Sequence, residues 1–199
     1  MFTPWNSFFS PEGRSLLQRG IDLALDEDGP ELTAQGVFAE DTVLRAVIRA
    51  KEDTLVVGLP VIGEVLTRLT RDFRWKALTQ EATPVPAMTQ VAEITAPAVA
   101  LLKAERVILN FVCHLSGIAN LTARYVRELE GTGVRLLDTR KTTPGLRWPE
   151  KYAVQAGGGC NHRKDLTEML MLKDNHIDAA GSVTAAVRAL RARYAPCPP

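Results

Sequence analysis

The chain has 199 residues, of which 46% are hydrophobic and 24% charged, so it can bury the core of one large domain or two small ones. Its formal net charge of +1 gives no overall positive field, and we therefore expect no nucleic-acid partner and no membrane partner. The three cysteines have no metal-binding spacing, and the amino-terminal residues lack the pattern of a signal peptide. No apolar run approaches about 18 residues. These features predict a soluble protein of the cytoplasm.

The first half of the sequence mixes predicted helices with short strands. Ser10 and Pro11 are typical of a helix start, and the apolar stripe that follows predicts a helix to about Asp26. From Thr42 to Ala50 apolar and basic residues alternate, which predicts a half-buried strand. We expect these strands to be antiparallel. The remaining predicted elements are a strand over 54–58, a helix over 60–69, an alternating segment over 73–77, a loop around 84–86 and a strand over 88–94.

The second half begins with the longest periodic segment of the chain. Apolar residues recur near helical spacing over 97–129, and we expect Gly117 to bend this helix or to pack closely against a neighbour. Alternating strands and helices follow, which is typical of a parallel sheet or barrel, where ligands bind at the carboxyl ends of the strands. These elements are a strand over 134–137, a helix over 149–156, a strand over 168–172 and a helix over 182–193.

Three polar blocks accompany these elements, at residues 138–145, 157–163 and 173–176. Arg140 and Lys141 come directly after the first of these two predicted strands, and Lys173 comes directly after the second. A guanidinium offers a planar fork to a carboxylate or phosphate, whereas an ammonium is a mobile point charge. The blocks therefore predict a pocket for a polyanion, or for two anions of different shape.

The first two of these blocks also have a plainer interpretation, whereas the block at 173–176 serves no packing need. Residues 142–145 have the composition of a tight turn, which we accept, although a turn does not explain the two adjacent cations. The glycine run at 157–159 is by itself better explained as a helix stop than as a backbone cradle for an anion. Cys160 and His162 are too sparse for a zinc site. Arg106 is by default an exposed helical arginine.

Taken together, four motifs carry a resemblance to a known family. They are D-T-R-K-T-T-P-G-L-R at 138–147, E-K-Y-A-V at 150–154, G-G-G-x-N-H-R at 157–163 and K-D-N-H-I at 173–177. This set resembles the quinolinate phosphoribosyltransferases, also called carboxylating nicotinate-nucleotide pyrophosphorylases. Related nicotinate enzymes and a molybdenum-associated paralogue share the fold, but the K-D-N-H motif favours the quinolinate branch. Segments at 58–60, 105–110 and 115–119 are similar to the family as well, and the resemblance runs from about residue 24 to about residue 190.

The resemblance implies an α/β fold in two parts. Residues 1–108 would form an amino-terminal α/β sandwich domain, and residues 109–199 the first part of an α/β barrel that carries the quinolinate-binding motifs. Barrels of the family continue further, with a glutamate and an aspartate near the Mg²⁺–substrate complex and glycine-rich turns for the 5′-phosphate. We therefore expect this chain to be truncated at its carboxyl end and its barrel to be incomplete.

The resemblance also implies a reaction. Members of the family join quinolinate to 5-phosphoribosyl-1-pyrophosphate, with Mg²⁺, and release nicotinate mononucleotide, pyrophosphate and CO₂ in NAD biosynthesis. This chain would then be such a pentosyltransferase and would form a homodimer or a higher homo-oligomer. The alternative is a noncatalytic, truncated remnant that dimerises or binds quinolinate without turnover.

The motif positions imply a role for each site residue. Lys141 would contact the phosphoribosyl substrate, shared with Lys173, and these two lysines are the expected catalytic residues. Arg106 would reach across a dimer interface into the partner's site, which replaces its default interpretation. No residue is expected to be a metal ligand. The two quinolinate carboxylates would be bound, with Thr139 assisting, by Arg140, His162, Arg163 and Lys173.

Overall fold

The computed structural model describes residues 2–194 and 196. The chain divides into two compact units, Met1–Asn161 and His162–Pro199. In the described residues no helix is long and apolar enough to cross a membrane. The predicted domain boundary between residues 108 and 109 falls inside one helix, α5 (Ala98–Glu128), and stays a prediction.

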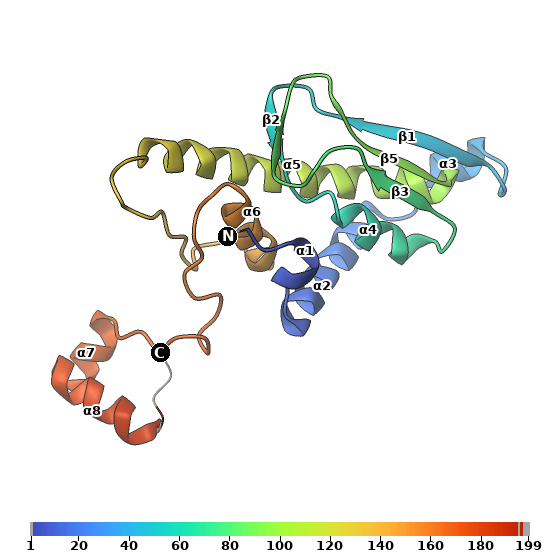
Figure 1. Ribbon diagram of the computed structural model, residues 1–199. Coiled ribbons are helices and arrows are strands. Elements are labelled where there is room, and N and C mark those ends of the chain that lie inside the picture. Colours follow the sequence, from blue (N-terminus) through green and yellow to red (C-terminus); the bar gives the residue numbers. More distant parts are fainter. Residues whose placement is uncertain (1, 195, 197–199) are drawn as a thin grey trace. The chain divides into compact units, whose positions relative to one another are not determined.

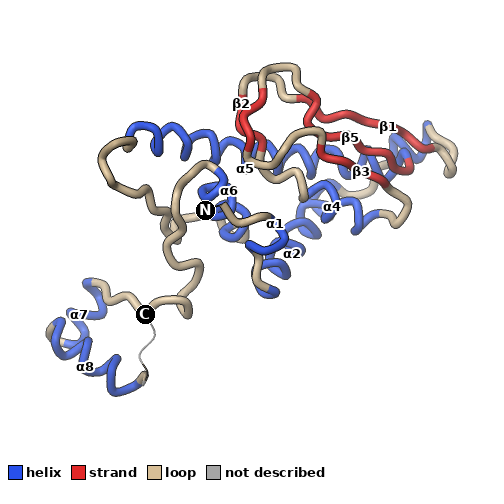
Figure 2. The backbone as a smooth tube through the Cα atoms, in the orientation of Figure 1, coloured by secondary structure: helices blue, strands red, loops and turns tan. Residues whose placement is uncertain are grey.

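Antiparallel strands make up the sheets of the first unit (Figure 2). The predicted antiparallel pairing is confirmed, and along β1 the residues Leu44, Ala46 and Ile48 are half-buried while their neighbours are exposed. β4 was predicted as a loop because it contains Pro84, yet proline is tolerated in a short edge strand. Within the described chain the sheets are β1 (Val43–Arg49), β5 (Gln90–Pro97) and β3 (Arg74–Ala77), in that order, and β2 (Thr54–Val56) with β4 (Thr83–Val85).

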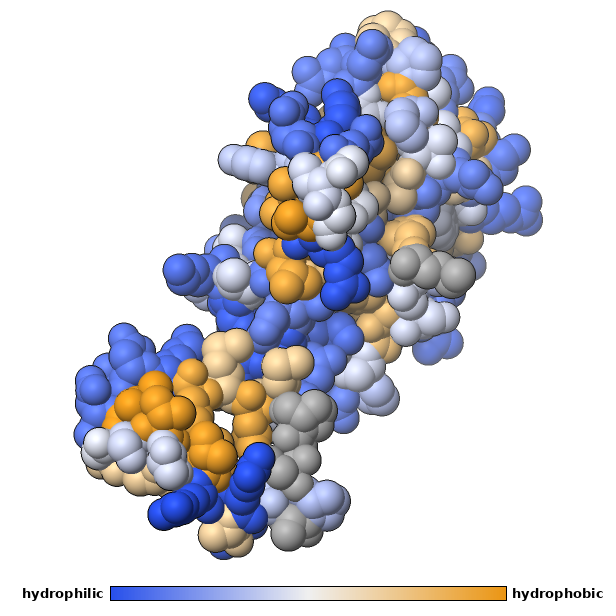
Figure 3. All heavy atoms as spheres, turned by 60° about the vertical axis from the view of Figure 1, so that its left-hand side comes forward, coloured by the Kyte–Doolittle hydropathy of each residue, from blue (hydrophilic) through white to orange (hydrophobic). Residues whose placement is uncertain are grey.

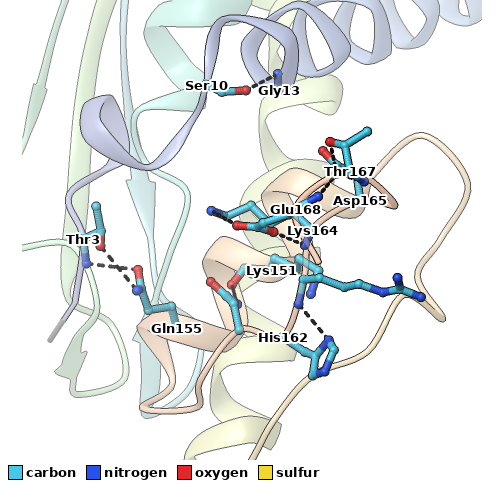
Figure 4. A network of polar contacts seen from close by, with 12 residues as sticks. Thr3, Ser10, Gly13, Lys151, Gln155, His162, Lys164, Asp165, Thr167 and Glu168 are labelled. Carbon is cyan, nitrogen blue, oxygen red and sulfur yellow. Dashed lines mark hydrogen bonds and ion pairs between the residues drawn. The ribbon is translucent and has the colours of Figure 1, made fainter. Parts of the chain in front are cut away.

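The helices of the first unit confirm four predicted helices and add two short ones. The Ser10 hydroxyl accepts a hydrogen bond from the Gly13 N–H at 3.1 Å, so it caps α2 as expected (Figure 4). Helices α1 and α3, of 4 and 6 residues, are too short to give a periodic signal. The helices are α1 (Trp5–Phe8), α2 (Pro11–Asp28), α3 (Leu32–Val37), α4 (Val61–Leu69), α5 (Ala98–Glu128) and α6 (Arg147–Ala156).

Helix α5 is the central element of this unit (Figure 1). It contacts α2, α4 and α6 as well as strands of both sheets. Two of its polar side chains satisfy the backbone around β2: Ser116 Oγ accepts from the Val57 N–H at 3.0 Å, and Asn120 Oδ1 accepts from the Leu55 N–H at 2.9 Å. Ser116, in the 115–119 segment singled out in the sequence, thus contacts the residue that follows β2.

Gly117 does not have the packing role that we predicted. It is exposed, and no atom lies within 4 Å of the position that a Cβ would take. Helix α5 runs unbroken through it, because the buried side of the helix is made by other positions, such as Leu115 and Ala119. The prediction of close packing at Gly117 is wrong.

Both strands predicted in the second half are absent from the described residues. Over 134–137 there is a single parallel bridge, between Leu137 and Cys160, and the preceding Gly131 and Gly133 have positive φ and are exposed. Residues 168–172 have no ladder partner in the described chain. A short apolar run becomes a strand only when another strand pairs with it, and none does so here.

The second unit consists of a turn and two helices, α7 (Asp174–Ala180) and α8 (Val183–Arg193). The Asp165 carboxylate accepts hydrogen bonds from the Thr167 N–H and hydroxyl (Figure 4). Ser182 caps α8, whose predicted range is confirmed. Apolar side chains, including Leu166 and Val183, are exposed on this unit (Figure 3).

Aromatic residues of the amino-terminal segment surround α6. The Tyr152 ring lies 4.9 Å from the Trp5 ring and 5.3 Å from the Phe8 ring, centroid to centroid. At the far end of α6, Gln155 exchanges hydrogen bonds with Thr3: it accepts from the Thr3 N–H at 3.0 Å and donates to the Thr3 hydroxyl at 3.3 Å (Figure 4). Helix α6 follows residues 138–146, which contain Arg140 and Lys141 and which we call the basic loop. This helix is thus packed against the first residues of the chain.

Gly13 of α2 lies against Trp148 of α6, and its replacement by alanine should destabilise the chain. A Cβ at residue 13 would lie 2.6 Å from Trp148 Cε2, so the indole must shift. We expect Gly13→Ala to lower the free energy of unfolding by about 1–3 kcal/mol in urea titration. Gly20→Ala is the control in the same helix, since its Cβ would lie 3.9 Å from Leu146, and it should be neutral or stabilising by up to about 1 kcal/mol. Equal effects would contradict this packing.

Candidate active site

A buried ion pair holds the start of the basic loop against α6. The Lys151 ammonium lies 2.5 Å from the Asp138 carboxylate, and the two side chains are 1% and 8% exposed. The Asn161 side-chain amide donates to the Asp138 carboxylate and to the Lys151 carbonyl, both at 2.8 Å. Three separate segments of the chain therefore meet at one buried pair of charges.

Backbone hydrogen bonds also hold Asp138 in place. The Asp138 N–H donates to the Cys160 carbonyl at 3.1 Å, and the Cys160 N–H donates to the Leu136 carbonyl at 2.8 Å. This parallel bridge replaces the strand that we predicted at 134–137. Arg140 and Lys141 therefore still follow a backbone pairing, although a much shorter one than expected.

The other end of the loop is a tight turn. The Leu146 N–H donates to the Thr143 carbonyl at 3.0 Å, with Pro144 and Gly145 at the central positions. Gly145 has a φ of +81°, which a glycine adopts without strain. The predicted turn is confirmed, and α6 begins directly after it.

Glu150 links this turn to two helices. Its Oε2 accepts a hydrogen bond from the Thr143 N–H at 3.2 Å, and its Oε1 lies 2.9 Å from His114 Nε2. His114 belongs to α5, whereas Glu150 is the fourth residue of α6. The carboxylate therefore ties the end of the loop to both α5 and α6.

Arg140 and Lys141 lie between these two anchors. Arg140 Nε is buried, and no hydrogen-bond acceptor for it exists among the described residues. The Lys141 side chain is exposed, and its backbone N–H donates to the Thr139 hydroxyl at 3.0 Å. A loop with fixed ends thus carries a guanidinium whose Nε lacks an acceptor, next to an exposed ammonium.

The glycine run ends α6. The N–H groups of Gly157, Gly158 and Gly159 all donate to carbonyls of α6, each at 3.0 Å. A Cβ on Gly157 would lie 2.7 Å from Thr122 Cβ of α5, so glycine also permits the close approach of the two helices. The helix-stop interpretation is confirmed, and these N–H groups are engaged within the first unit.

The second unit contains three of the predicted site residues. The Arg163 N–H donates to His162 Nδ1 at 2.8 Å, and the Arg163 guanidinium donates to the Met169 carbonyl at 2.7 Å. Lys173 is the residue before α7, and its N–H donates to His176 Nδ1 at 3.1 Å. The prediction that Lys173 follows a strand is wrong, because residues 168–172 form none; Lys173 instead begins a helix.

Arg106 lies in a different part of the first unit. It is exposed on α5 and lines a surface hollow together with Glu31 and Thr33 near the start of α3. It precedes His114, which contacts α6, by eight residues, or about 12 Å of helix. Within one chain Arg106 thus lies beside α3, and its role in a partner's site stays a prediction.

The described residues do not assemble a metal-binding cluster. No group of three or more His, Cys, Asp or Glu side chains is placed to hold an ion in this part of the chain. The acids near the basic loop, Asp138 and Glu150, are engaged with Lys151 and His114. These residues do not fit a resident Mg²⁺, so no step of the chemistry is assigned to a metal held by them.

A second acid, the half-buried Glu81, fixes the backbone just before α4. The Glu81 carboxylate accepts hydrogen bonds from the N–H groups of Gly58 and Leu59, just before α4. Burial raises the pKa of Glu81 above its ordinary value, against the lowering effect of these N–H groups. Burial and the neighbouring Glu81 carboxylate also raise the pKa of Tyr152 in α6. The 58–60 segment thus has a structural role.

Four residues of this site had no role in the sequence analysis. Lys151, Glu150 and Asn161 lie inside motifs that carry the family resemblance, yet only their tertiary contacts reveal that they fix the basic loop. The sequence around Lys151 does not indicate that its side chain is only 1% exposed, because lysine is rarely buried. His114 lies in a helix with no charged pattern around it, and nothing in the sequence pairs it with Glu150.

Solved structures show the class to which this fold belongs. The nicotinate-nucleotide pyrophosphorylase of Francisella tularensis matches with a TM-score of 0.82 and 36% identity, covering 91% of this chain and 65% of that one. NadC of Streptococcus pyogenes matches with a TM-score of 0.82 and 38% identity, covering 93% of this chain and 65% of that one. The chain therefore has the α/β fold of the nicotinate-nucleotide pyrophosphorylases, which confirms the predicted fold class.

Sequence comparisons agree with this class. The models "Quinolinate phosphoribosyl transferase, N-terminal domain" and "C-terminal domain" match residues 31–116 and 118–197. The carboxylating nicotinate-nucleotide pyrophosphorylase of Mycobacterium leprae is 39% identical over 177 residues, which are 86% of this chain and 62% of that protein. The human enzyme of the same name is 38% identical over 188 residues, 90% of this chain and 63% of that protein. The chain belongs to the quinolinate phosphoribosyltransferase family, and it spans less than two thirds of the length of these relatives.

Breaking the buried ion pair should be costly. Lys151→Met removes the ammonium beside a carboxylate that is 8% exposed, and we expect the free energy of unfolding to fall by about 3–5 kcal/mol. Arg68→Ala is the control, because its pair with Asp22 is 34% and 48% exposed and should contribute about 0–1 kcal/mol. Urea titration of both variants measures the difference. A loss for Lys151→Met no larger than that for the control would show that the pair does not hold the loop.

Glu81 should give the chain a measurable dependence of stability on pH. Because its folded pKa is raised, its contribution is fully present below the ordinary value of 4.5 and is lost as the pH rises through the folded pKa. The unfolding free energy of the wild type relative to Glu81→Gln should therefore fall as the pH rises from 4.5 toward neutrality. Thermal unfolding over a pH series tests this.

Glu93 is the matched control for that series. Its hydrogen bond to Arg45 lowers its pKa, so its contribution is present above 4.5 and is lost as the pH falls through the folded pKa. The wild type relative to Glu93→Gln should therefore lose stability as the pH falls below 4.5. The same sign for both residues would contradict the assignment of Glu81 as a carboxyl that burial favours in its protonated form.

Proposed function

We propose that this chain binds quinolinate and 5-phosphoribosyl-1-pyrophosphate and acts as a quinolinate phosphoribosyltransferase of NAD biosynthesis. Membership of the family supports the reaction type. The observation in the structure that supports it best is Arg140, whose Nε is buried without an acceptor in a loop fixed at both ends. A guanidinium held in this way is prepared for an anion that is not part of the chain.

The roles proposed for the site residues follow from their charge and position. Arg140 binds one carboxylate of the dicarboxylic substrate, with Thr139 beside it. Lys141, which is exposed, contacts the phosphoribosyl substrate. We propose that the cations and the imidazole of the second unit make the remaining carboxylate contacts; these residues are His162, Arg163 and Lys173. For Arg106 we propose a contact in the site of a partner chain.

The chemistry asks mainly for binding and orientation. The pyridine nitrogen bonds to C1 of the ribose as the bond from C1 to pyrophosphate breaks, through an oxocarbenium-like state. The ring nitrogen is then positively charged, so it stabilises the electron pair that stays on C2 when the 2-carboxylate departs as CO₂, and a proton then bonds to C2. Cations that hold both anions close together serve this sequence, and little acid–base chemistry is needed from side chains.

Mg²⁺ and assembly are further parts of the proposal. Magnesium prefers several waters and substrate phosphates to an all-protein cage, so we propose that it arrives with the pyrophosphate of the phosphoribosyl substrate. We propose a homodimer or a higher homo-oligomer, in which Arg106, exposed on α5, would serve the site of a second copy. We also propose a cytoplasmic setting, which the free Cys113 and Cys160 support.

Production of nicotinate mononucleotide from both substrates with Mg²⁺ is the direct test of the activity. Calorimetry with quinolinate alone separates binding from turnover. Binding with no product would favour the noncatalytic alternative for this chain. Neither binding nor product would contradict the proposal as a whole.

Replacing the two cations of the basic loop should affect the two substrates differently. Arg140→Ala removes the carboxylate contact, and we expect quinolinate affinity in calorimetry to fall by about a hundredfold. Lys141→Ala should leave quinolinate affinity within about threefold and weaken the phosphoribosyl substrate instead. Arg135→Ala, an exposed arginine shortly before the loop, is the control and should change neither affinity. Equal losses from both loop variants would contradict this division of roles.

A further inference from the structure

Glu150 is a buried acid that the proposed reaction does not use. Its side chain is 11% exposed, and both of its oxygens are engaged: Oε1 with His114 Nε2 at 2.9 Å and Oε2 with the Thr143 N–H at 3.2 Å. A carboxylate is suited to this position, because it lies in the first turn of α6, where the helix dipole favours a negative charge. One side chain therefore connects α5, α6 and the basic loop.

The loop depends on this contact because it has few others. From Thr139 to Thr142, the hydrogen bonds that the structure describes are the local one from the Lys141 N–H to the Thr139 hydroxyl and one from the Arg147 side chain to the Thr142 hydroxyl. The amino-terminal end is fixed at Asp138 by the buried ion pair. At the carboxyl end, the bond from the Thr143 N–H to Glu150 joins the loop to α6.

Losing this anchor should disturb the loop more than the whole fold. Thr143 is exposed, so water can replace Glu150 at its N–H at a modest cost in stability. Water does not hold the N–H in one place, however, whereas the carboxylate is itself held by His114. Without Glu150 this end of the loop is held by the turn between Thr143 and Leu146, which does not join it to α5. Arg140 then samples more positions, and a site that binds by orientation loses affinity when its cation is not held in place.

We propose that Glu150, held by His114, is a positioning residue that orders the loop of Arg140 and Lys141 for the dicarboxylic substrate. The substrate in this inference rests on the proposed function, whereas the order of the loop does not. Glu150 acts through the backbone of Thr143 and does not touch the substrate itself.

The test uses the full chain with two readouts. Trypsin cleaves after Arg140 and Lys141, so the rate of cleavage at these two bonds, followed by mass spectrometry, reports how well the loop is ordered. Calorimetry with quinolinate reports substrate binding. We expect Glu150→Ala to raise the cleavage rate at both bonds about tenfold and to weaken quinolinate binding about tenfold.

Three further variants separate positioning from general destabilisation. Glu150→Gln keeps an acceptor for the Thr143 N–H and a polar group facing His114, so both readouts should stay within about twofold of the wild type. His114→Ala should change both readouts in the same direction as Glu150→Ala, but less. Glu64→Ala breaks the ion pair between Arg14 of α2 and Glu64 of α4, far from the loop in sequence, and should change neither readout.

The outcomes distinguish this inference from the proposed function. The positioning role is overturned if the cleavage rate at the two bonds in Glu150→Ala equals that of the wild type. It is also overturned if the rate rises equally in Glu64→Ala. Faster cleavage with unchanged quinolinate affinity overturns its connection to the substrate. If the wild type binds no quinolinate, the proposed function fails together with that connection, and the cleavage rates alone then decide whether Glu150 orders the loop.

Discussion

The ion pair between Lys151 and Asp138 is the contact on which the rest of the site depends. It joins the end of the 134–138 segment to α6, and Asn161 binds both partners from a third segment. Isolated charges are too costly to bury, so the two groups can leave water only together. The basic loop begins at one partner of this pair, and the helix that anchors its other end contains the second.

The sequence predicted those elements whose signal is local. The Ser10 cap and the period-two pattern around Ala46 mark α2 and β1, and both were found where expected. The strands at 134–137 and 168–172 were wrong, because a strand depends on a partner elsewhere in the chain, which local patterns do not reveal. β4 was missed for a related reason, since the proline at its centre is acceptable only because the strand lies at an edge.

The residues of the site likewise divide into those that a local sequence pattern reveals and those that only tertiary contacts reveal. Arg140 and Lys141 could be singled out because adjacent cations before a Pro-Gly turn have no structural purpose, and the turn itself was predicted from composition. The residues that hold them could not be. Glu150 and His114 are 36 positions apart in the sequence, and their contact exists only because α6 packs on α5. Sequence motifs thus mark side chains that are able to bind or react, whereas tertiary packing decides which of these side chains are held in one position.

The hydrogen bonds between Thr3 and Gln155 connect residues 152 positions apart. Together with the aromatic residues around Tyr152, they close a loop of the chain that includes most of the first unit, and the entropy lost in closing a loop grows with its length. The basic loop is tied to α6 at both ends. That helix is held in turn by contacts from the first residues and from the middle of the chain, so the position of the loop depends on segments that are distant from it in the sequence.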